Sequence, residues 1–235
     1  MPHPIVRNIP RADPETIRVL GELGVATVHE ALGRTGLLEP AIRPIYPQAR
    51  TAGSAVTVLC PAGDNLMIHA ALSVVQPGDV LVVTTMSPSV DGMFGDVLAT
   101  SCQALGVAAL VLDAGVRDTA ELEAMQFPVW ARAVYSQGTI KAAAGSVNLP
   151  ITCAGLAVHP GDIVIGDRDG VMVVPRVRAE DAATLGEQRR DKETAIKARL
   201  AKGELTLDVM DLRKLLDALG VTWVDSAPQS CADRR

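Results

Sequence analysis

Apolar and polar positions along this chain follow two different periods in turn. Short apolar runs such as "VLVVTTM" and "VAALVL" alternate with stretches such as "DVLATSCQALG", in which apolar residues recur at helical spacing. Strands that alternate with helices of about ten residues are typical of βαβ units. The pattern therefore predicts an α/β layered fold with parallel strand pairs.

The two ends of this pattern differ from its middle. "RADPETIRVLGELG" predicts a helix with Asp13 as N-cap, Pro14 at the first helical position and Gly24 at its end, and a second short helix, "ATVHEALGRTG", follows. Later, "HPGDIVIGDRDGVMVVP" predicts two strands joined as a hairpin by "DRDG". A hairpin beside parallel strands favours a mixed sheet or a partly closed barrel.

Domain organisation is expected to be simple. The chain has 235 residues, of which 48% are hydrophobic, enough to bury a real core. We expect one catalytic domain over residues 1–205, including the N-terminal helices and a polar helical arm at 178–200. Residues 206–235 are expected to form a C-terminal helix and tail.

Composition also excludes some partners and locations. The net charge is -5 and the basic residues are scattered, so nucleic acid is not expected as a ligand. No apolar run approaches the roughly 20 residues of a membrane span, and the N-terminus lacks an apolar signal core. The four cysteines lack paired spacing and are interpreted as reduced packing residues, which places the chain in the cytoplasm: Cys60, Cys102, Cys153 and Cys231.

Several kinds of chemistry lack a motif. The four histidines are too far apart for a histidine-based zinc site, and no Gly-x-Ser-x-Gly elbow or dinucleotide fingerprint is present. No lysine lies in an apolar strand that would desolvate it for Schiff-base chemistry. The sequence does not exclude a Mg²⁺ or Mn²⁺ site with carboxylate ligands.

The strongest candidate site lies at two neighbouring strand ends. Gly95 to Leu98 open a helix after one strand, and Arg117 and Asp118 precede a helix after the next. Ligands of α/β proteins collect at such strand ends, where free helix amides can hold a carboxylate. Helix capping by Asp96 and Asp118 explains the same residues equally well. Asp113 could contact the metal's waters or Arg117, or it could lie in an ordinary turn at the end of the strand, and His69 is expected to be a packed or capped helix residue rather than a ligand.

The stretch "GDVLATSCQALGVAALVLDAGVRD" resembles the signature of a known family. Twenty residues separate Asp96 from Arg117-Asp118, as in the 4-hydroxy-4-methyl-2-oxoglutarate / 4-carboxy-4-hydroxy-2-oxoadipate aldolases. These class II pyruvate aldolases share the fold of the regulator of ribonuclease activity A. "GVATVHEALGRTGLL", "PGDVLVV" and "HPGDIVIGDRDGVMVVP" resemble the family in the same order, over most of residues 15–200. The resemblance implies a single-domain ββα sandwich with a mixed central sheet or partial barrel.

The resemblance also implies roles for individual residues. Asp118 would be the direct protein ligand of Mg²⁺ or Mn²⁺, and Arg117 would contact the ketone oxygen and carboxylate of the substrate. Asp96 would orient metal-bound water, so that Arg117 and Asp96 are the catalytic groups. An adjoining subunit would bring acidic residues near the metal, for which Glu30 and Glu193 are proposed, with Asp113 as a further neighbour. The backbone amides that would bind the substrate carboxylate are those of Gly95, Asp96, Val97 and Leu98.

The activity implied is cleavage of a small 4-hydroxy-2-oxo di- or tricarboxylic acid. 4-Carboxy-4-hydroxy-2-oxoadipate would give pyruvate and oxaloacetate, and 4-hydroxy-4-methyl-2-oxoglutarate two pyruvates, in the degradation of aromatic compounds. Decarboxylation of oxaloacetate would be a secondary activity, since it forms the same enolate. A homotrimer or a hexamer of two trimers is implied. The alternatives are a non-enzymatic regulator of a ribonuclease and a dedicated oxaloacetate decarboxylase.

Overall fold

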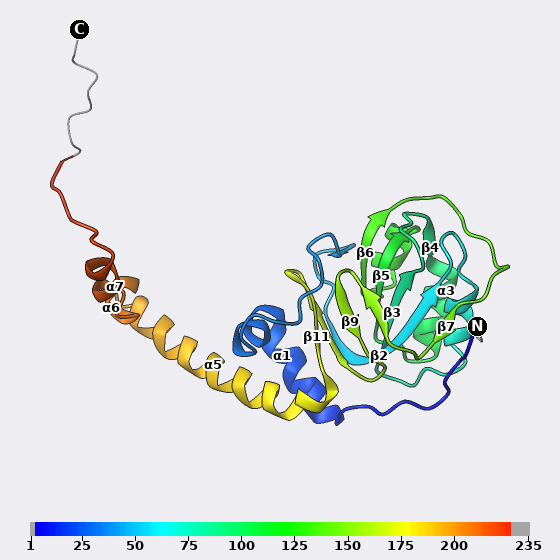
Figure 1. Cartoon of the computed structure of the whole chain (residues 1–235), viewed down its shortest axis with the longest axis horizontal. Coiled ribbons are helices and arrows are strands. Elements are labelled where there is room, and N and C mark those ends of the chain that lie inside the picture. The colour runs from blue at the N-terminus through cyan, green and yellow to red at the C-terminus, as the bar shows by residue number, and fades with distance from the viewer. Residues whose placement is uncertain (1–2, 227–235) are drawn as a thin grey trace, which may run out of the picture. The chain divides into compact units, whose positions relative to one another are not determined.

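The computed structural model describes residues 3–226 of the chain (Figure 1). It contains two compact units, one ending at Arg189 and one beginning at Arg190. The division falls within the long helix α5 (Ala179–Leu200). The expected domain boundary after residue 205 stays a prediction.

The first unit is built on one large sheet. Nine strands of the described residues form it in the order β1-β6-β5-β3-β2-β10-β11, with β4 added beside β5 and β7 beside β2. Two further strands, β8 and β9, pair separately. The bounds are β1 Arg43–Pro44, β2 Thr51–Cys60, β3 Asp79–Thr85, β4 Gly92–Phe94, β5 Ala109–Val116, β6 Val129–Val134, β7 Ser146–Val147, β8 Ile151–Cys153, β9 Leu156–Val158, β10 Ile163–Asp167 and β11 Gly170–Val174.

Strand directions confirm a mixed sheet. β2, β3, β5 and β6 are mutually parallel, as the alternating pattern predicts. β10 and β11 form the expected antiparallel hairpin, and β10 pairs antiparallel with β2. The result is an α/β fold whose sheet is barrel-like and nearly closed. The short strands β1, β4, β7, β8 and β9 are additions that the pattern does not predict.

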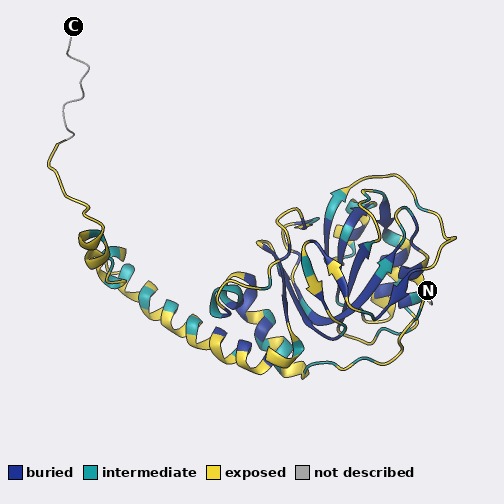
Figure 2. Ribbon diagram, in the orientation of Figure 1, coloured by how far each residue is buried: buried dark blue, intermediate teal, exposed yellow. Residues whose placement is uncertain are grey.

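Helices cover the sheet and complete the core. Their bounds are α1 Pro14–Ala31, α2 Leu66–Ala71, α3 Asp96–Ala104, α4 Thr119–Ala124, the 3₁₀ helix η1 Arg176–Arg178, α6 Thr206–Val209 and α7 Arg213–Ala218, besides α5. One buried cluster joins α2, α3 and α4 to one face of β2, β3 and β5. A second cluster lies on the opposite face, and a third joins α1 and the start of α5 to β10 and β11. Buried residues accordingly follow the strands in Figure 2.

The N-terminal helix pair forms as predicted. The Asp13 carboxylate accepts a hydrogen bond from the Thr16 amide at 2.9 Å and caps α1. Gly24 has φ 79° and interrupts the helix, so α1 is two helices joined at a kink. The second of them is capped by Asp167, whose Oδ2 accepts a hydrogen bond from the Val25 amide at 2.9 Å. A residue of the β10–β11 hairpin therefore fixes the direction of this helix.

The cysteines agree with a packing role. Cys60, Cys102 and Cys153 are buried free thiols, and burial raises the pKa of Cys60 and Cys102 to about 12 each. Cys231 lies outside the described residues. In the described part of the chain, no helix is both long and apolar enough to cross a membrane.

The second unit has no core of its own. It contains the end of α5 together with α6 and α7, and none of its described residues, 190–226, is buried. Ion pairs on its surface join Arg199 to Glu204 at 2.6 Å and Arg213 to Asp208. Large apolar side chains are exposed along it: Leu205, Met210, Leu215, Leu219, Val221, Trp223 and Val224.

Candidate active site

A small pocket lies where β4 and β5 end and α3 begins. Its volume is about 210 Å³. Pairing of β4 with β5 brings the two halves of the motif together, because Phe94 lies opposite Val116 and the Arg117 amide donates to the Phe94 carbonyl at 3.0 Å. The lining residues are Asn65, His69, Gly92, Met93, Phe94, Gly95, Asp96, Val97, Leu98, Arg117, Asp118 and Lys141.

Gly95 makes room for Asp118. A Cβ atom on Gly95 would overlap Oδ2 of Asp118 and come within 3.3 Å of the Arg117 side chain. Asp118 has a left-handed backbone with φ 56° and ψ 39°, which Asp tolerates better than most residues. This backbone conformation turns the carboxylate toward α3, where Oδ2 accepts a hydrogen bond from the Asp96 amide at 3.3 Å.

This geometry separates the site from simple helix capping. Asp118 occupies the N-cap position of α4, but its side chain makes no capping hydrogen bond there. The N-cap of α3 is Gly95 rather than Asp96. The Asp118 carboxylate therefore reaches across to the neighbouring helix instead of stabilising its own.

The first amides of α3 already hold carboxylates. The Asp96 amide donates to Asp118, and the Val97 amide donates to Oδ1 of Asp96 at 2.7 Å. Free amides and the helix dipole make a helix N-terminus favourable for anions. The N-terminus of α3 thus has the donors that an incoming carboxylate needs, with Leu98 packed beneath them in the core.

Arg117 supplies positive charge to the same pocket. Its Nε lies 3.6 Å from Oδ2 of Asp118, and 46% of its side chain is exposed. A Cβ on Gly138 would lie 3.3 Å from an Arg117 guanidinium nitrogen, so this glycine leaves space beside the group. The guanidinium is therefore held between Asp118 and the loop at residue 138, with donors left for a ligand.

Three further residues line the pocket, and none of them was assigned to the site from the sequence. Asn65 donates from Nδ2 to the Met93 carbonyl at 2.9 Å, while its buried Oδ1 has no hydrogen-bond partner among the described residues. His69 follows on α2, and Lys141 comes from the loop after β6. Partial burial, together with the charge of Lys141, lowers the pKa of His69 below its ordinary value. No spacing motif links these residues to the strand ends, so only the fold brings them together.

A buried carboxylate connects the Asn65 and Lys141 segments. Asp64 is 1% exposed and accepts hydrogen bonds from the amides of Leu66, Ala142 and Ala143 at 2.9, 2.6 and 2.8 Å. Burial alone would raise the pKa of Asp64, but the three amides and Lys141 outweigh it, so the pKa lies below its ordinary value. Asp64 thereby anchors the loop that carries Lys141.

The prediction that Asp113 lies near Arg117 is wrong. Asp113 belongs to β5 itself, not to a loop, and it shares a sheet face with Val111 rather than with Leu112 and Ala114. Its carboxylate pairs with Arg132 and accepts a hydrogen bond from the Ala154 amide at 2.7 Å. Strand alternation places it on the face opposite the pocket.

The two proposed interface acids lie outside this pocket. Glu30 is near the end of α1, where it pairs with Arg34 at 3.1 Å and approaches Arg189 at 3.7 Å. Glu193 lies on α5 in the second unit. Their contribution to the site of a neighbouring subunit stays a prediction.

The donor set fits a hard divalent cation. The described residues hold no cluster of three or more His, Cys, Asp or Glu side chains arranged for a metal. Mg²⁺ in proteins keeps several waters and needs only one or two carboxylates. Asp118, with Asp96 beside it, provides oxygen ligands of that kind.

Comparisons with known proteins identify the family. The family described as "RraA-like: Aldolase/RraA" matches residues 25–173, so the chain belongs to it. A protein of Halalkalibacterium halodurans, provisionally named 4-hydroxy-4-methyl-2-oxoglutarate aldolase, is 29% identical over 192 residues, 82% of this chain and 89% of that protein. One of the same provisional name from Burkholderia multivorans is 36% identical over 61% of this chain and 87% of its own length.

Solved structures agree with this family. The structure of Streptomyces coelicolor RraAS2, described as an unusual member of the RNase ES inhibitor RraA protein family, superposes with a TM-score of 0.73 at 26% identity. The match covers 81% of this chain and 99% of that one. The barrel-like mixed sheet is therefore the fold of this family.

Proposed function

We propose that this protein is a divalent-metal-dependent aldolase that cleaves 4-hydroxy-2-oxo acids to release pyruvate. The observation that carries the proposal is the meeting of Arg117, the α3 amides and the Asp118 carboxylate in one pocket, with Gly95 leaving the room they need. The provisional names of the curated relatives support the same activity. The substrates proposed are 4-hydroxy-4-methyl-2-oxoglutarate and 4-carboxy-4-hydroxy-2-oxoadipate, intermediates of aromatic-compound degradation.

The pyruvoyl end of the substrate binds at the N-terminus of α3. Its carboxylate accepts hydrogen bonds from the amides of residues 95–98 and displaces the carboxylates of Asp96 and Asp118 that those amides hold in this structure. Asn65 Oδ1, buried and without a partner among the described residues, favours a ligand with a hydrogen-bond donor, such as an ordered water.

Arg117 stabilises the charge that develops during cleavage. Breaking the C3–C4 bond leaves pyruvate as its enolate, with negative charge on the C2 oxygen. The Arg117 guanidinium is fixed beside Asp118 and can donate to that oxygen. Asp118, with Asp96 beside it, would hold Mg²⁺ or Mn²⁺, which supplies Lewis-acid stabilisation of the same charge when bound.

The C4 hydroxyl must lose its proton as the bond breaks. Asp96 is only partly buried, and a substrate carboxylate at the α3 amides would release its side chain from the Val97 amide, so the Asp96 carboxylate is available to orient water at the pocket mouth. Asp96 therefore positions the water that accepts the C4 proton. Decarboxylation of oxaloacetate needs only the enolate-stabilising part of this machinery and follows as a secondary activity.

Lys141 and His69 are the groups proposed to read the far end of the substrate. Both line the pocket on the side formed by α2 and the loop after β6. Lys141 offers a full positive charge to a distal carboxylate, whereas the lowered pKa of His69 keeps it neutral near pH 7. One charged and one neutral group at this end of the pocket suit the two proposed substrates, whose C4 substituents differ in charge.

The active enzyme is proposed to be a trimer or a pair of trimers with sites shared between subunits. One chain presents Asp118 and Asp96 but no third acidic ligand among its described residues. Glu30 and Glu193 of adjoining chains would supply the missing carboxylates. A non-enzymatic ribonuclease regulator has the same fold, so the fold does not separate the two functions.

Pyruvate release tests the proposal directly. Each hydroxy-oxo acid is incubated with the full-length protein, and pyruvate is followed by coupled NADH oxidation with lactate dehydrogenase. We expect cleavage that stops after EDTA treatment and returns with Mg²⁺ or Mn²⁺. Cleavage that persists without metal, or none under any condition, contradicts the proposal, and turnover of oxaloacetate alone identifies a dedicated decarboxylase.

A further inference from the structure

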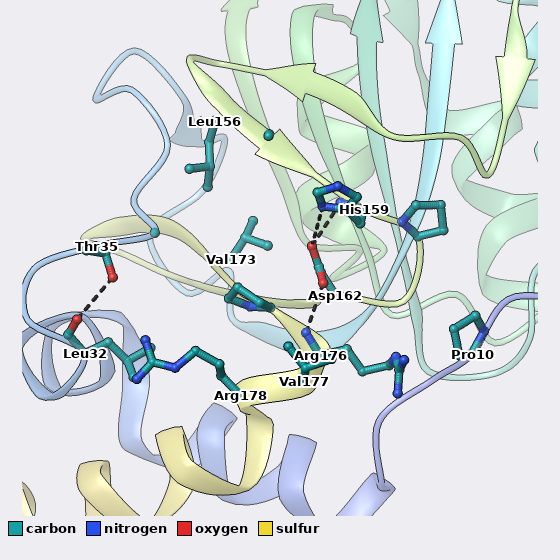
Figure 3. Close-up of a pocket in the computed structure, with 14 residues that line it drawn as sticks. Pro10, Leu32, Thr35, Leu156, His159, Asp162, Val173, Arg176, Val177 and Arg178 are labelled. Carbon is teal, nitrogen blue, oxygen red and sulfur yellow. Dashed lines mark hydrogen bonds and ion pairs between the residues drawn. The ribbon is translucent and has the colours of Figure 1, made fainter.

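A second, larger pocket lies in the first unit, away from the candidate active site. Its volume is about 540 Å³, within the range of small-molecule sites, which is roughly 300–1,000 Å³. Five segments enclose it: the segment before α1 at Pro10, the loop after α1, β9 with the turn into β10, the end of β11, and η1 (Figure 3). None of its lining residues lines the site at α3.

The floor of this pocket is apolar. Leu32 and Val173 belong to the buried core, being 8% and 4% exposed. Leu156 lies above them in Figure 3, and Val177 of η1 is 83% exposed at the margin. An apolar surface that lies open in a concave site gains free energy when a ligand covers it.

Two arginines flank this floor. Among residues 3–226, the guanidinium groups of Arg176 and Arg178 make no hydrogen bond or ion pair with another residue. Figure 3 shows them extending in opposite directions from η1, Arg176 toward Pro10 and Arg178 toward Leu32. Positive charge is therefore present on both sides of the apolar floor.

Asp162, the acidic residue that lines this pocket, already has hydrogen-bond partners. Asp162 is 7% exposed and accepts hydrogen bonds from the amides of His159 and Arg176, each at 2.9 Å. The His159 ring also approaches it, with Nδ1 3.6 Å from Oδ2. Asp162 thus fixes the backbone that carries Arg176, and these donors offset its negative charge.

We propose that this pocket binds an organic carboxylate with an apolar body, such as an aromatic or branched aliphatic acid. The apolar body covers Leu32, Val173 and Val177, and the carboxylate pairs with Arg176 or Arg178. A guanidinium pairs with a carboxylate through two parallel hydrogen bonds, which gives the site its preference for acids over neutral analogues. The proposal is independent of the aldolase chemistry.

Calorimetric titration of the full-length protein with 4-tert-butylbenzoate tests this site. We expect saturable binding, and at least ~10-fold weaker binding of 4-tert-butylbenzamide, which lacks the charge. The Arg176→Gln/Arg178→Gln double variant should bind 4-tert-butylbenzoate more weakly than wild type by a similar factor. Ala157→Phe, at an exposed position that lines the pocket, should block binding without changing any charge.

Two control variants locate the binding. Arg168→Gln removes an exposed arginine at the β10–β11 turn, outside the pocket, and should bind like wild type. Arg117→Gln removes the guanidinium of the active site and should also bind like wild type. Equal affinity for acid and amide overturns the proposal, as does binding lost in Arg117→Gln but kept in the double variant. An absence of binding to wild type also overturns it.

Discussion

The Asp118 carboxylate lies in the space that the Cβ atom of any other residue at position 95 would fill, so Gly95 is what leaves room for Asp118. The two residues are far apart in the chain and meet because β4 pairs with β5. The left-handed backbone of Asp118 completes the arrangement. The carboxylate can face α3 only if residue 95 has no Cβ atom.

Gly95→Ala should therefore disable the site while leaving the fold intact. The added methyl group pushes Asp118 away from the α3 amides and moves Arg117, whose side chain lies 3.3 Å from the point that the methyl carbon would occupy. We expect kcat/KM for pyruvate release to fall by ~10²-fold or more, which is the loss in rate typical of removing one hydrogen-bond donor that stabilises the developing charge. Gly95 itself has an extended backbone, with φ -155°, so the added methyl group and not backbone strain causes the loss, and an unchanged circular dichroism spectrum should show that the fold is kept. Normal turnover by Gly95→Ala would mean that Asp118 is not needed in this position.

Much of this site could be predicted from the sequence, because its central residues follow one another along two βα units. The alternation of strand and helix put Asp96 and Arg117 at neighbouring strand ends, where α/β folds gather ligands. Asp113 was misjudged because β5 continues to Val116, so that alternation along the strand turns this side chain to the other face. Asn65 and Lys141 were missed because they reach the pocket through long-range packing, with Asp64 joining their segments.

Lys141→Gln should change substrate binding more than chemistry. Lys141 lines the pocket, and its ammonium group is proposed to hold a distal carboxylate. We expect KM for 4-carboxy-4-hydroxy-2-oxoadipate to rise by ~10-fold or more, with a smaller change in kcat, since a uniform binding interaction is lost. Oxaloacetate decarboxylation by the same variant is the internal comparison, because oxaloacetate is shorter than 4-carboxy-4-hydroxy-2-oxoadipate and should depend less on Lys141. Equal losses of kcat for both substrates would instead assign Lys141 to the chemical step.

Mixed oligomers should reveal whether sites are shared between subunits. Arg117→Ala and Glu30→Gln chains are each expected to be inactive alone, because one lacks the guanidinium and the other the carboxylate proposed to come from a neighbour. Co-expressing the two chains with different affinity tags should restore partial activity in the doubly tagged fraction. A doubly tagged fraction as inactive as either parent would show that Glu30 serves its own chain or no site at all.

Stability should depend on pH through Asp64. Three backbone amides and Lys141 lower its pKa in the folded state despite burial, whereas the unfolded chain has the ordinary Asp value of about 3.9. The ionised carboxylate therefore stabilises the fold above about pH 3.9, and this contribution is lost as pH falls through the lowered folded pKa. Asp64→Asn should lower the urea midpoint at pH 7, and the gap to wild type should narrow as the medium is acidified below pH ~4.

The comparison requires equal protein concentrations, because assembly would also shift the midpoint. Asp169→Asn, which changes an exposed carboxylate at the β10–β11 turn, is the control for removing a surface charge. If the Asp64→Asn gap stays constant from pH 7 down to pH ~3, the amide cluster does not stabilise the charged form preferentially. The loop carrying Lys141 would then be held in place by contacts other than the Asp64 carboxylate.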